Sequence, residues 1–341
     1  MSIVEDFNLK SWSSFALEAR AKWATEVYNE LQLEKAFAFA ETQQAKVLCI
    51  GKGCNILFAD DFDGLVIRMC IEGIEQVDES PEYVYVKAGG GVDWQELVQW
   101  SLKRQLSGIE NLTLIPGSVG AAPVQNIGAY GVELKDSLFE LEVYDQAEGV
   151  KKLKFEECGL AYRNSHFKGK WKGKRWVTSV TLRLNKQARL SVEYGGIKKV
   201  LEQRGLNNPT VQELSDVIAS IRRSKLPDPD ELANAGSFFR NPIVSVEKLS
   251  ELKAKYPDMV TYPAHSGYEK CAAGWLIDSC SLKGYRDGDA GVHKDQALVL
   301  VNYGKASGDD MLQLARYVRD QVLQRFGIRL EPEVEIVGAL L

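Results

Sequence analysis

Apolar residues recur along this chain at two spacings, one typical of helices and one typical of strands. An apolar stripe predicts a helix over residues 30–44, where Leu31, Ala36, Phe37 and Ala40 recur at helical spacing. Further helices are predicted at residues 246–255, 271–277 and 311–326, and the capping pairs Asp93–Glu96 and Thr210–Glu213 predict two more.

Strands are predicted where short apolar or alternating runs meet turn residues. The helix that follows Thr210 should stop before residues 225–232, because Pro227 and Pro229 cannot continue it, and we expect a domain boundary there. Mixed helices and strands with long separations favour an α+β fold over a regular doubly wound sheet. The predicted strands are residues 46–50, 83–88, 176–184, 297–302 and 334–341.

Composition and charge narrow the function classes. Of the 341 residues, 45% are hydrophobic and 26% are charged, as in ordinary globular proteins, and a formal net charge of -5 argues against a surface that coats nucleic acid. Neither a secretory signal nor an apolar run as long as a membrane span is visible, so we expect a cytoplasmic protein without membrane or nucleic-acid partners. The cysteines lack a C-x-x-C pair and the histidines lack zinc spacing, which favours reduced thiols and no metal site.

The most informative stretch is IPGSVGAAPVQNIGAYGVE, at residues 115–133. Its glycines let the backbone turn tightly and approach an anion, and Gln125, Asn126 and Tyr130 add neutral donors and acceptors. On glycine content alone, a loop that merely packs well is the more frequent case. The stretch is neither a Walker loop nor a Rossmann fingerprint, and GKGCNI at residues 51–56 lacks the third glycine of that fingerprint.

Three shorter motifs carry side chains suited to chemistry, and each also has an ordinary structural explanation. Arg163 in AYRNSHF is of the type that clamps a carboxylate, although most such arginines are simply exposed. Ser237 in NAGSFFRNP lies outside a G-x-S-x-G elbow, and only three histidines are available to activate it, which disfavours a hydrolase. Glu331 and Glu333 flank Pro332 at the entry to a strand, where solvated acids are common.

Taken together and in order, these motifs resemble those of the UDP-N-acetylenolpyruvoylglucosamine reductase (MurB) family. The resemblance covers nearly the whole chain, and residues 260–278 are similar to the Tyr-containing substrate loop of the family's long form. The matching strings are GKGCNILF (51–58), the stretch at 115–133, AYRNSHF (161–167), KLPDP (225–229), NAGSFFRNP (234–242), AAGWLID (272–278) and LEPEV (330–334).

This resemblance implies an FAD-binding fold of the vanillyl-alcohol-oxidase (PCMH) type with an added substrate-binding domain. It implies FAD and NADPH as cofactors and the enolpyruvyl ether of a UDP-sugar as substrate, which would be reduced to UDP-N-acetylmuramate for peptidoglycan synthesis. We expect a monomer. The implied domains are residues 1–72 with 327–341 and residues 73–226 for FAD, and residues 227–326 for the substrate.

Carried over by motif, Arg163 would be the active-site arginine, Ser237 the proton donor and Glu333 the active-site acid. Cys54 departs from the serine usual in the family's G-x-G-S-N turn, and a thiol is a weaker donor. The implied flavin contacts are Gly51, Gly53, Cys54, Asn55, Pro116, Gly117, Ser118, Gly120, Gln125, Asn126, Gly128, Ala129 and Tyr130. The implied substrate contacts are Tyr194, Lys225, Asn241, Tyr262, Lys270 and Gln296.

Two other functions stay open at this point. A flavin oxidase of the same fold class would pass electrons to oxygen and would have no task for Lys225, Ser237 or Lys270. A non-catalytic module that binds a UDP-sugar or a flavin would keep the glycine-rich stretch without the catalytic set. The presence of Arg163, Ser237 and Glu333 together favours the reductase.

Overall fold

The computed structural model describes residues 1–194 and 196–341, and the chain forms two compact units. The last change of unit along the chain falls between Ser224 and Lys225, at the start of the proline-containing segment. The three-domain division implied by the resemblance stays a prediction. Unit 1 consists of Met1–Phe7, Ala21–Lys52 and Asp63–Ser224, and unit 2 of Asn8–Arg20, Gly53–Phe62 and Lys225–Leu341.

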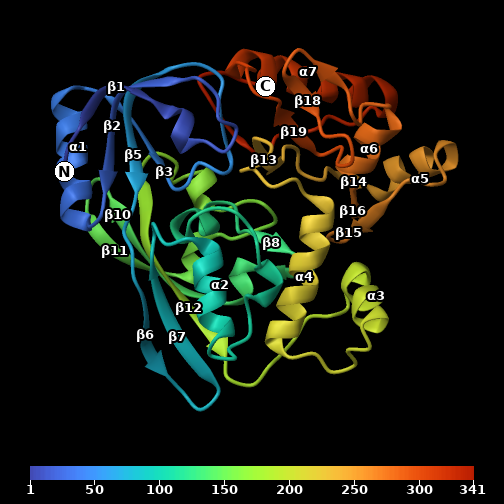
Figure 1. Cartoon of the computed structure of the whole chain (residues 1–341), viewed down its shortest axis with the longest axis horizontal. Helices are drawn as coiled ribbons and strands as arrows, with labels where there is room; N and C mark the ends of the chain where they lie inside the picture. The colour runs from blue at the N-terminus through green and yellow to red at the C-terminus, as the bar shows by residue number, and fades with distance from the viewer. The chain divides into compact units, whose positions relative to one another are not determined.

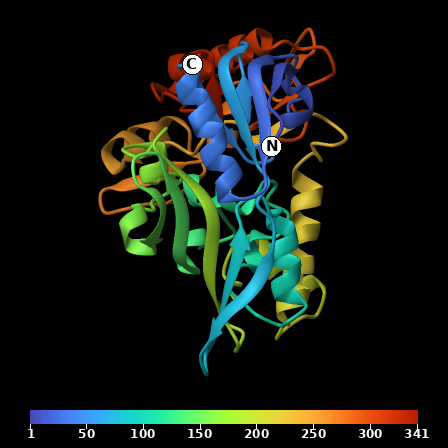
Figure 2. The same ribbon diagram turned by 90° about the vertical axis from the view of Figure 1, so that its left-hand side faces the viewer.

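The first sheet of unit 1 has four strands in the order β1-β2-β5-β3 and packs against helix α1, Glu30–Thr42 (Figures 1 and 2). The helix begins after Asn29, whose side chain accepts a hydrogen bond from the Gln32 N–H. Ala36, Phe37 and Ala40 of α1 belong to the shared apolar core with Leu65 of β5, as the helical spacing in the sequence predicted. The prediction was wrong for Leu31, which is exposed, whereas Leu33 is buried. The strands are β1 (Val4–Asn8), β2 (Arg20–Val27), β3 (Lys46–Ile50) and β5 (Phe62–Met69).

The second sheet of unit 1 is antiparallel, in the order β11-β10-β12-β7-β6. Helix α2 (Trp94–Leu102) packs into its core, and the Asp93 side chain accepts from the Glu96 N–H at 3.1 Å, as the capping pair predicted. Figure 2 shows β6 and β7 as a long hairpin. The strands are β6 (Ile74–Glu79), β7 (Tyr83–Gly89), β10 (Leu138–Asp145), β11 (Gly149–Lys154) and β12 (Arg175–Asn185).

Two helices complete unit 1, α3 (Gly195–Gln203) and α4 (Val211–Lys225), and their buried apolar side chains form one cluster. The Thr210 N–H donates to Glu213 Oε2 at 2.7 Å, and the Glu213 N–H donates to Thr210 Oγ1 at 3.2 Å. This reciprocal pair is the capping box predicted from the sequence. The helix ends two residues before Pro227, which cannot continue it.

Unit 2 has two antiparallel sheets, in the orders β13-β19-β18-β17 and β14-β16-β15, and a parallel pair of β20 with β4. Its helices are α5 (Val246–Lys255), α6 (Ala273–Ser279) and α7 (Gly308–Phe326). The strands are β4 (Ile56–Phe58), β13 (Asn234–Ser237), β14 (Ile243–Ser245), β15 (Thr261–Pro263), β16 (Tyr268–Cys271), β17 (Arg286–Asp287), β18 (Ala290–Val292), β19 (Val299–Asn302) and β20 (Glu335–Val337).

Helix α7 begins three residues before its predicted start. Ser307 caps it, accepting from the Asp310 N–H at 3.1 Å while Asp310 Oδ2 accepts from the Ser307 N–H. The first helical residue is Gly308, where an added Cβ would overlap the Phe58 carbonyl oxygen. The close approach of α7 to the end of β4 therefore requires glycine at this position.

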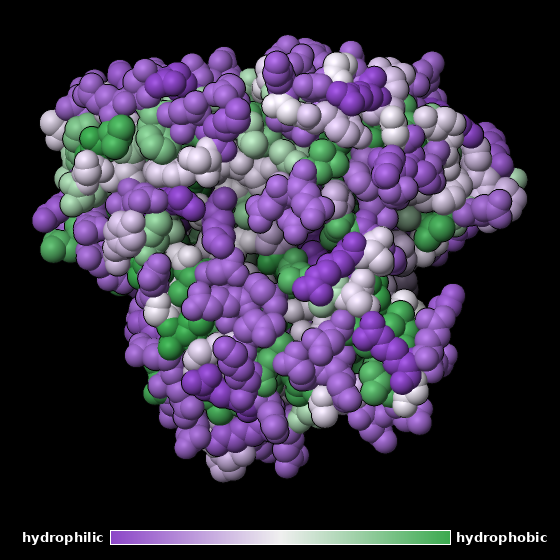
Figure 3. Space-filling view, in the orientation of Figure 1, coloured by the Kyte–Doolittle hydropathy of each residue, from purple (hydrophilic) through white to green (hydrophobic). Residues whose placement is uncertain are grey.

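None of the helices in the described part of the chain combines the length and hydrophobicity that crossing a membrane requires. On the face drawn in Figure 3, hydrophilic residues predominate and hydrophobic residues occur in small groups between them.

Candidate active site

Two close contacts at glycines hold the glycine-rich segment within unit 1. An added Cβ at Gly51, directly after β3, would overlap Ser118 Oγ. A Cβ at Gly120 would lie 2.9 Å from the Gly90 carbonyl oxygen and 3.1 Å from that of Val177. The atoms that a Cβ at Gly120 would meet belong to the backbone, so glycine is required there, whereas Gly51 lies against the Ser118 side chain.

These features suit the pyrophosphate of a bound dinucleotide such as FAD. Ser118 Oγ is buried and makes no hydrogen bond with any residue that the structure describes. A buried hydroxyl without a partner is unfavourable unless a ligand supplies one. Pro116 and Gly117 precede it, and the Gly117 carbonyl accepts from the Trp94 N–H at 3.0 Å. Bare backbone lets a phosphate approach within hydrogen-bond distance, so this segment fits the implied cofactor.

A two-residue turn presents Tyr130 at the end of this segment. Gly128–Ala129 (β8) pairs with Val132–Glu133 (β9), and Tyr130 and Gly131 between them have φ angles of 51° and 83°. Positive φ at both central residues is typical of a type I′ turn, and for tyrosine it costs about 1–2 kcal/mol. The Tyr130 ring meets that of Tyr194 edge-on, with centroids 5.5 Å apart. Burial raises the pKa of Tyr130, so its hydroxyl stays protonated and can donate.

Asn111 positions this turn, and it lies outside every motif identified in the sequence. Its fully buried side chain donates from Nδ2 to the Tyr130 carbonyl at 3.0 Å and to the Ser191 carbonyl at 2.9 Å. One amide thus ties the turn to the segment that leads to Tyr194. Its partners lie 19 and 80 residues away, so no local pattern in the sequence identifies this role.

Arg163 occupies a tight turn of unit 1. The backbones of Ala161 and Asn164 exchange hydrogen bonds of 3.0 Å and 3.1 Å around it, and Arg163 has a φ of 51°. Its Nη2 donates to the Gly128 carbonyl at 2.8 Å, which joins the guanidinium to the hairpin that carries Tyr130. Left-handed backbone at non-glycine residues is concentrated at functional sites, and the structure brings two such residues together here.

Gln125 and Asn126, which precede the hairpin, differ in how accessible their side-chain amides are to a ligand. Asn126 is fully buried, and its Nδ2 lies 3.0 Å from Glu133 Oε2 and 3.1 Å from the Ala161 carbonyl. Its side chain therefore holds the segment together. Gln125 is only half-buried, and its Oε1 accepts from Lys168 Nζ at 3.3 Å. Of the two, Gln125 has the side chain that is better exposed to a ligand.

Ser237 and Glu333 lie on neighbouring stretches of unit 2. Ser237 ends β13 and pairs with Val299, and the next carbonyl, that of Phe238, accepts from the Glu333 N–H at 2.8 Å. Asn55 joins the same group, because its Nδ2 donates to the Glu333 carbonyl at 3.2 Å. One backbone and one side-chain hydrogen bond thus bring together three predicted residues that are up to 278 positions apart in the sequence.

The turn before Asn55 depends on Gly53, which has a φ of 69° and would overlap the Trp12 carbonyl oxygen if it carried a Cβ. We expect Gly53→Ala to lower the free energy of unfolding by about 3 kcal/mol or more, because left-handed strain adds to overpacking. Gly173→Ala is a matched control with a φ of 69° and nothing within 4 Å of the added atom, so it should lose only about 1–2 kcal/mol. Denaturant unfolding of both variants measures the difference, and equal losses would contradict the importance of the Trp12 contact. The half-buried Cys54 follows Gly53 and forms no disulfide.

Tyr262 and Lys270 face each other in the three-stranded sheet of unit 2. The register pairs Tyr262 of β15 with Lys270 of β16, and Lys270 with Ile243 of β14. Directly opposed residues point to the same side of a sheet, so the phenol and the ammonium share one face. Just before β14, Asn241 Oδ1 accepts from the Ala273 N–H at 2.9 Å and so joins this sheet to the start of α6.

The remaining two predicted substrate residues lie at a helix end and in the loop between β18 and β19. Lys225 is the exposed last residue of α4. Gln296 is half-buried, and its N–H donates to His293 Nδ1 at 3.1 Å. Burial lowers the pKa of His293, which agrees with a neutral ring accepting at this nitrogen. The predicted residues thus fall into two sets, one within each unit.

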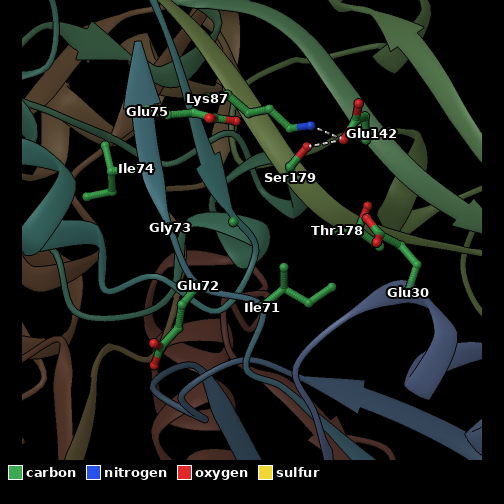
Figure 4. Close-up of a pocket in the computed structure, with 11 residues that line it drawn as sticks. Glu30, Ile71, Glu72, Gly73, Ile74, Glu75, Lys87, Glu142, Thr178 and Ser179 are labelled. Carbon is green, nitrogen blue, oxygen red and sulfur yellow. Dashed lines mark hydrogen bonds and ion pairs between the residues drawn. The ribbon is translucent and has the colours of Figure 1, made fainter. Parts of the chain in front are cut away.

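A pocket of about 470 Å³ in unit 1 is lined by other residues (Figure 4). Glu30, Glu72 and Glu75 contribute carboxylates, while Lys87 pairs with Glu142 at 2.6 Å. Excess negative charge disfavours the phosphates of FAD and of a UDP-sugar, so we assign neither ligand to this pocket.

The chain is similar in sequence to two family models and to curated relatives. A model described as an FAD binding domain matches residues 24–153, and the C-terminal domain of UDP-N-acetylenolpyruvoylglucosamine reductase matches residues 228–337. The UDP-N-acetylenolpyruvoylglucosamine reductase of Pseudomonas aeruginosa is 44% identical over 335 residues, which cover 98% of each chain. That of Chromobacterium violaceum is 44% identical over 330 residues, 96% of this chain and 97% of the relative.

Solved structures support the predicted fold class. The reductase MurB from Thermus caldophilus aligns over 98% of each chain with a TM-score of 0.69 at 24% identity. A VAO-type flavoprotein from Myceliophthora thermophila aligns over 90% of this chain and 70% of its own, with a TM-score of 0.50 at 14% identity. The α+β fold of the vanillyl-alcohol-oxidase type is therefore confirmed. With more than two-fifths of its residues shared with curated relatives over nearly the full length, the chain belongs to the UDP-N-acetylenolpyruvoylglucosamine reductase family.

Proposed function

We propose that this protein uses NADPH and bound FAD to reduce UDP-N-acetylglucosamine enolpyruvate to UDP-N-acetylmuramate. The observation that carries the proposal is the 44% identity, over 98% of the chain, to a curated reductase of the family. The arrangement of Arg163 in unit 1, and of Ser237 beside Glu333 in unit 2, supports it. We further propose that the protein acts as a cytoplasmic monomer in peptidoglycan precursor synthesis.

The chemistry of an enolpyruvyl ether sets two tasks for the protein. The glycine-rich segment and residues 53–55 would hold FAD, whose chemistry would be the transfer of a hydride from NADPH to the methylene carbon of the substrate. Negative charge then grows on the substrate carboxylate, and preorganised positive charge lowers the energy of that state. Arg163 suits this task, because its charge is permanent and its planar fork matches a carboxylate.

Ser237 suits the second task, the delivery of a proton to the carbon beside the carboxylate, and Glu333 assists the first. A serine hydroxyl is a weak acid, so it acts as a donor only next to a strongly basic carbon. We assign this proton transfer to Ser237 Oγ. A protonated Glu333 carboxyl would donate a hydrogen bond to the substrate carboxylate and so share its growing charge. The short backbone connection between the two residues keeps them in a fixed relation.

The binding residues are assigned by their place in the two sets. The FAD contacts are proposed at the glycine-rich segment of unit 1 and at Gly53, Cys54 and Asn55 of unit 2. Lys225 and Lys270 supply focused positive charge to the UDP pyrophosphate in a chain whose net charge is -5. The other proposed substrate contacts are Tyr194, Asn241, Tyr262 and Gln296.

The flavin absorbance of the purified protein tests this function directly. Under anaerobic conditions, NADPH should bleach the visible flavin bands, and UDP-N-acetylglucosamine enolpyruvate should restore them. Recovery with oxygen alone would instead favour a flavin oxidase. A colourless protein that takes up no FAD would contradict the assignment as a flavoenzyme.

A further inference from the structure

Arg222 of α4 is a charged residue of unit 1 to which the proposed mechanism gives no task. Its Nε is buried and makes no hydrogen bond with the part of the chain that the structure describes. None of the ion pairs among the described residues includes it, and no carboxylate is among the groups that shift its pKa. Its neighbour Arg223 is exposed, so a solvated position is available one residue further along the helix. Burying one nitrogen of a half-buried guanidinium without a hydrogen-bond partner is unfavourable.

The surroundings of Arg222 belong to the candidate active site. Tyr130 packs against the apolar cluster that includes Ile218 and Ile221 of α4. Arg222 follows Ile218 by one helical turn, so the two side chains share a helix face. Desolvation lowers the pKa of Arg222, and the positive charge of Arg163 lowers it further. Arg163 contacts the same hairpin through its bond to the Gly128 carbonyl, two residues before Tyr130, so both arginines border the Tyr130 side of the site.

We infer that Arg222 and Arg163 form a guanidinium pair that holds an anionic group of a bound small molecule, with the Tyr130 hydroxyl as a neutral donor. An anion between them replaces repulsion with two charge-assisted interactions and supplies the partner that Arg222 Nε lacks within the protein. Arg163 is already oriented by its bond to the Gly128 carbonyl, so the pair is partly preorganised. The inference rests on the proposed function, which provides the anions.

Two groups in the proposed reaction carry suitable negative charge. One is the carboxylate or pyrophosphate of the UDP-sugar. The other is the ring system of reduced FAD, which is anionic near neutral pH and whose electronics respond to nearby charge. A second guanidinium would stabilise the negative charge of either group. Separate measurements on the FAD-loaded enzyme distinguish the UDP-sugar from the reduced flavin.

The experiment compares Arg222→Gln with Arg223→Gln, a control that removes the same charge from an exposed position one residue away. The first measurement is the midpoint potential of bound FAD without substrate. The second is the affinity of the oxidised enzyme for UDP-N-acetylmuramate, followed by the change in flavin absorbance. If the anion is reduced flavin, Arg222→Gln should weaken its binding relative to oxidised flavin about tenfold, equivalent to a potential lower by about 30 mV. If the anion belongs to the UDP-sugar, the dissociation constant should rise about tenfold or more and the potential should stay unchanged.

A purely structural role for Arg222 predicts a different pattern. Removing an uncompensated charge should leave the unfolding temperature of the oxidised, substrate-free enzyme unchanged or higher, whereas removing a structural contact should lower it. Arg222→Lys retains the charge and should recover most of the lost affinity or potential. A lysine variant no better than the glutamine variant, or a glutamine variant that matches Arg223→Gln in both measurements, overturns the inference. Bleaching and recovery of the wild-type flavin test the proposed function independently of this comparison.

Discussion

Replacing Ser237 with alanine is expected to slow transfer from the reduced enzyme to the enolpyruvyl sugar by about 100- to 10,000-fold. Reduction by NADPH should proceed at nearly the wild-type rate, because that step requires no proton at the substrate carbon. Anaerobic rapid mixing separates the two steps, with bleaching of the flavin bands reporting the first and their recovery the second. The ratio of the two rate constants is therefore the quantity that should change.

The position of Ser237 makes this variant interpretable. Its backbone pairs with Val299 in the sheet, and the following Phe238 and Phe239 are buried in the core of unit 2. Alanine retains those contacts and removes only the hydroxyl, so the unfolding temperature should change little. Equal slowing of both steps would contradict the role of proton donor and would indicate a general disturbance of the site.

Local signals in the sequence predicted those elements whose ends are determined by nearby side chains. The box formed by Thr210 and Glu213 opens α4 as expected, and the helix ends before Pro227 as expected. The cap at Asp93 likewise opens α2. At both helix starts the deciding hydrogen bonds join residues three positions apart, and the proline lies two residues beyond the helix end. A short window of sequence therefore contains all the information.

Boundaries set by tertiary contacts were less predictable. The helix predicted from residue 271 begins at Ala273, because Cys271 instead ends β16 and pairs with Thr261. The start of α7 is capped locally by Ser307 and Asp310, but the requirement for glycine at position 308 comes from the Phe58 carbonyl, 250 positions away in the sequence. Neither partner can be identified from the sequence around the helix.

The site shows the same division between local and distant information. Family resemblance named Arg163, Ser237 and Glu333, but it could not show that Asn126 is fully occupied within its own segment. Nor could it identify Asn111, whose partners are distant backbone carbonyls. A motif identifies residues that perform the same chemistry throughout a family. The residues that position them make contacts with distant parts of the chain, so only the folded structure identifies them.

Glu333→Ala is expected to slow transfer to the enolpyruvyl sugar by about 100- to 1,000-fold, the usual effect of losing one donor to developing negative charge. Reduction by NADPH should again be nearly unaffected. The backbone of Glu333 donates to the Phe238 carbonyl and accepts from Asn55, and alanine preserves both contacts. The loss should therefore reflect the carboxyl group alone.

Glu331→Ala is the matched control, because the same stretch carries this second acid two residues earlier. Glu331 is exposed and pairs with Arg240, and an exposed ion pair contributes only about 0–1 kcal/mol. The control should therefore retain nearly the full rate of both steps. If the two variants lose activity equally, negative charge along the stretch matters more than a placed carboxyl. Both variants remove one carboxylate, but only Glu333→Ala removes the proposed hydrogen-bond donor. If Glu333→Ala alone slows the second step, the hydrogen bond to the substrate carboxylate is therefore made by Glu333 in particular.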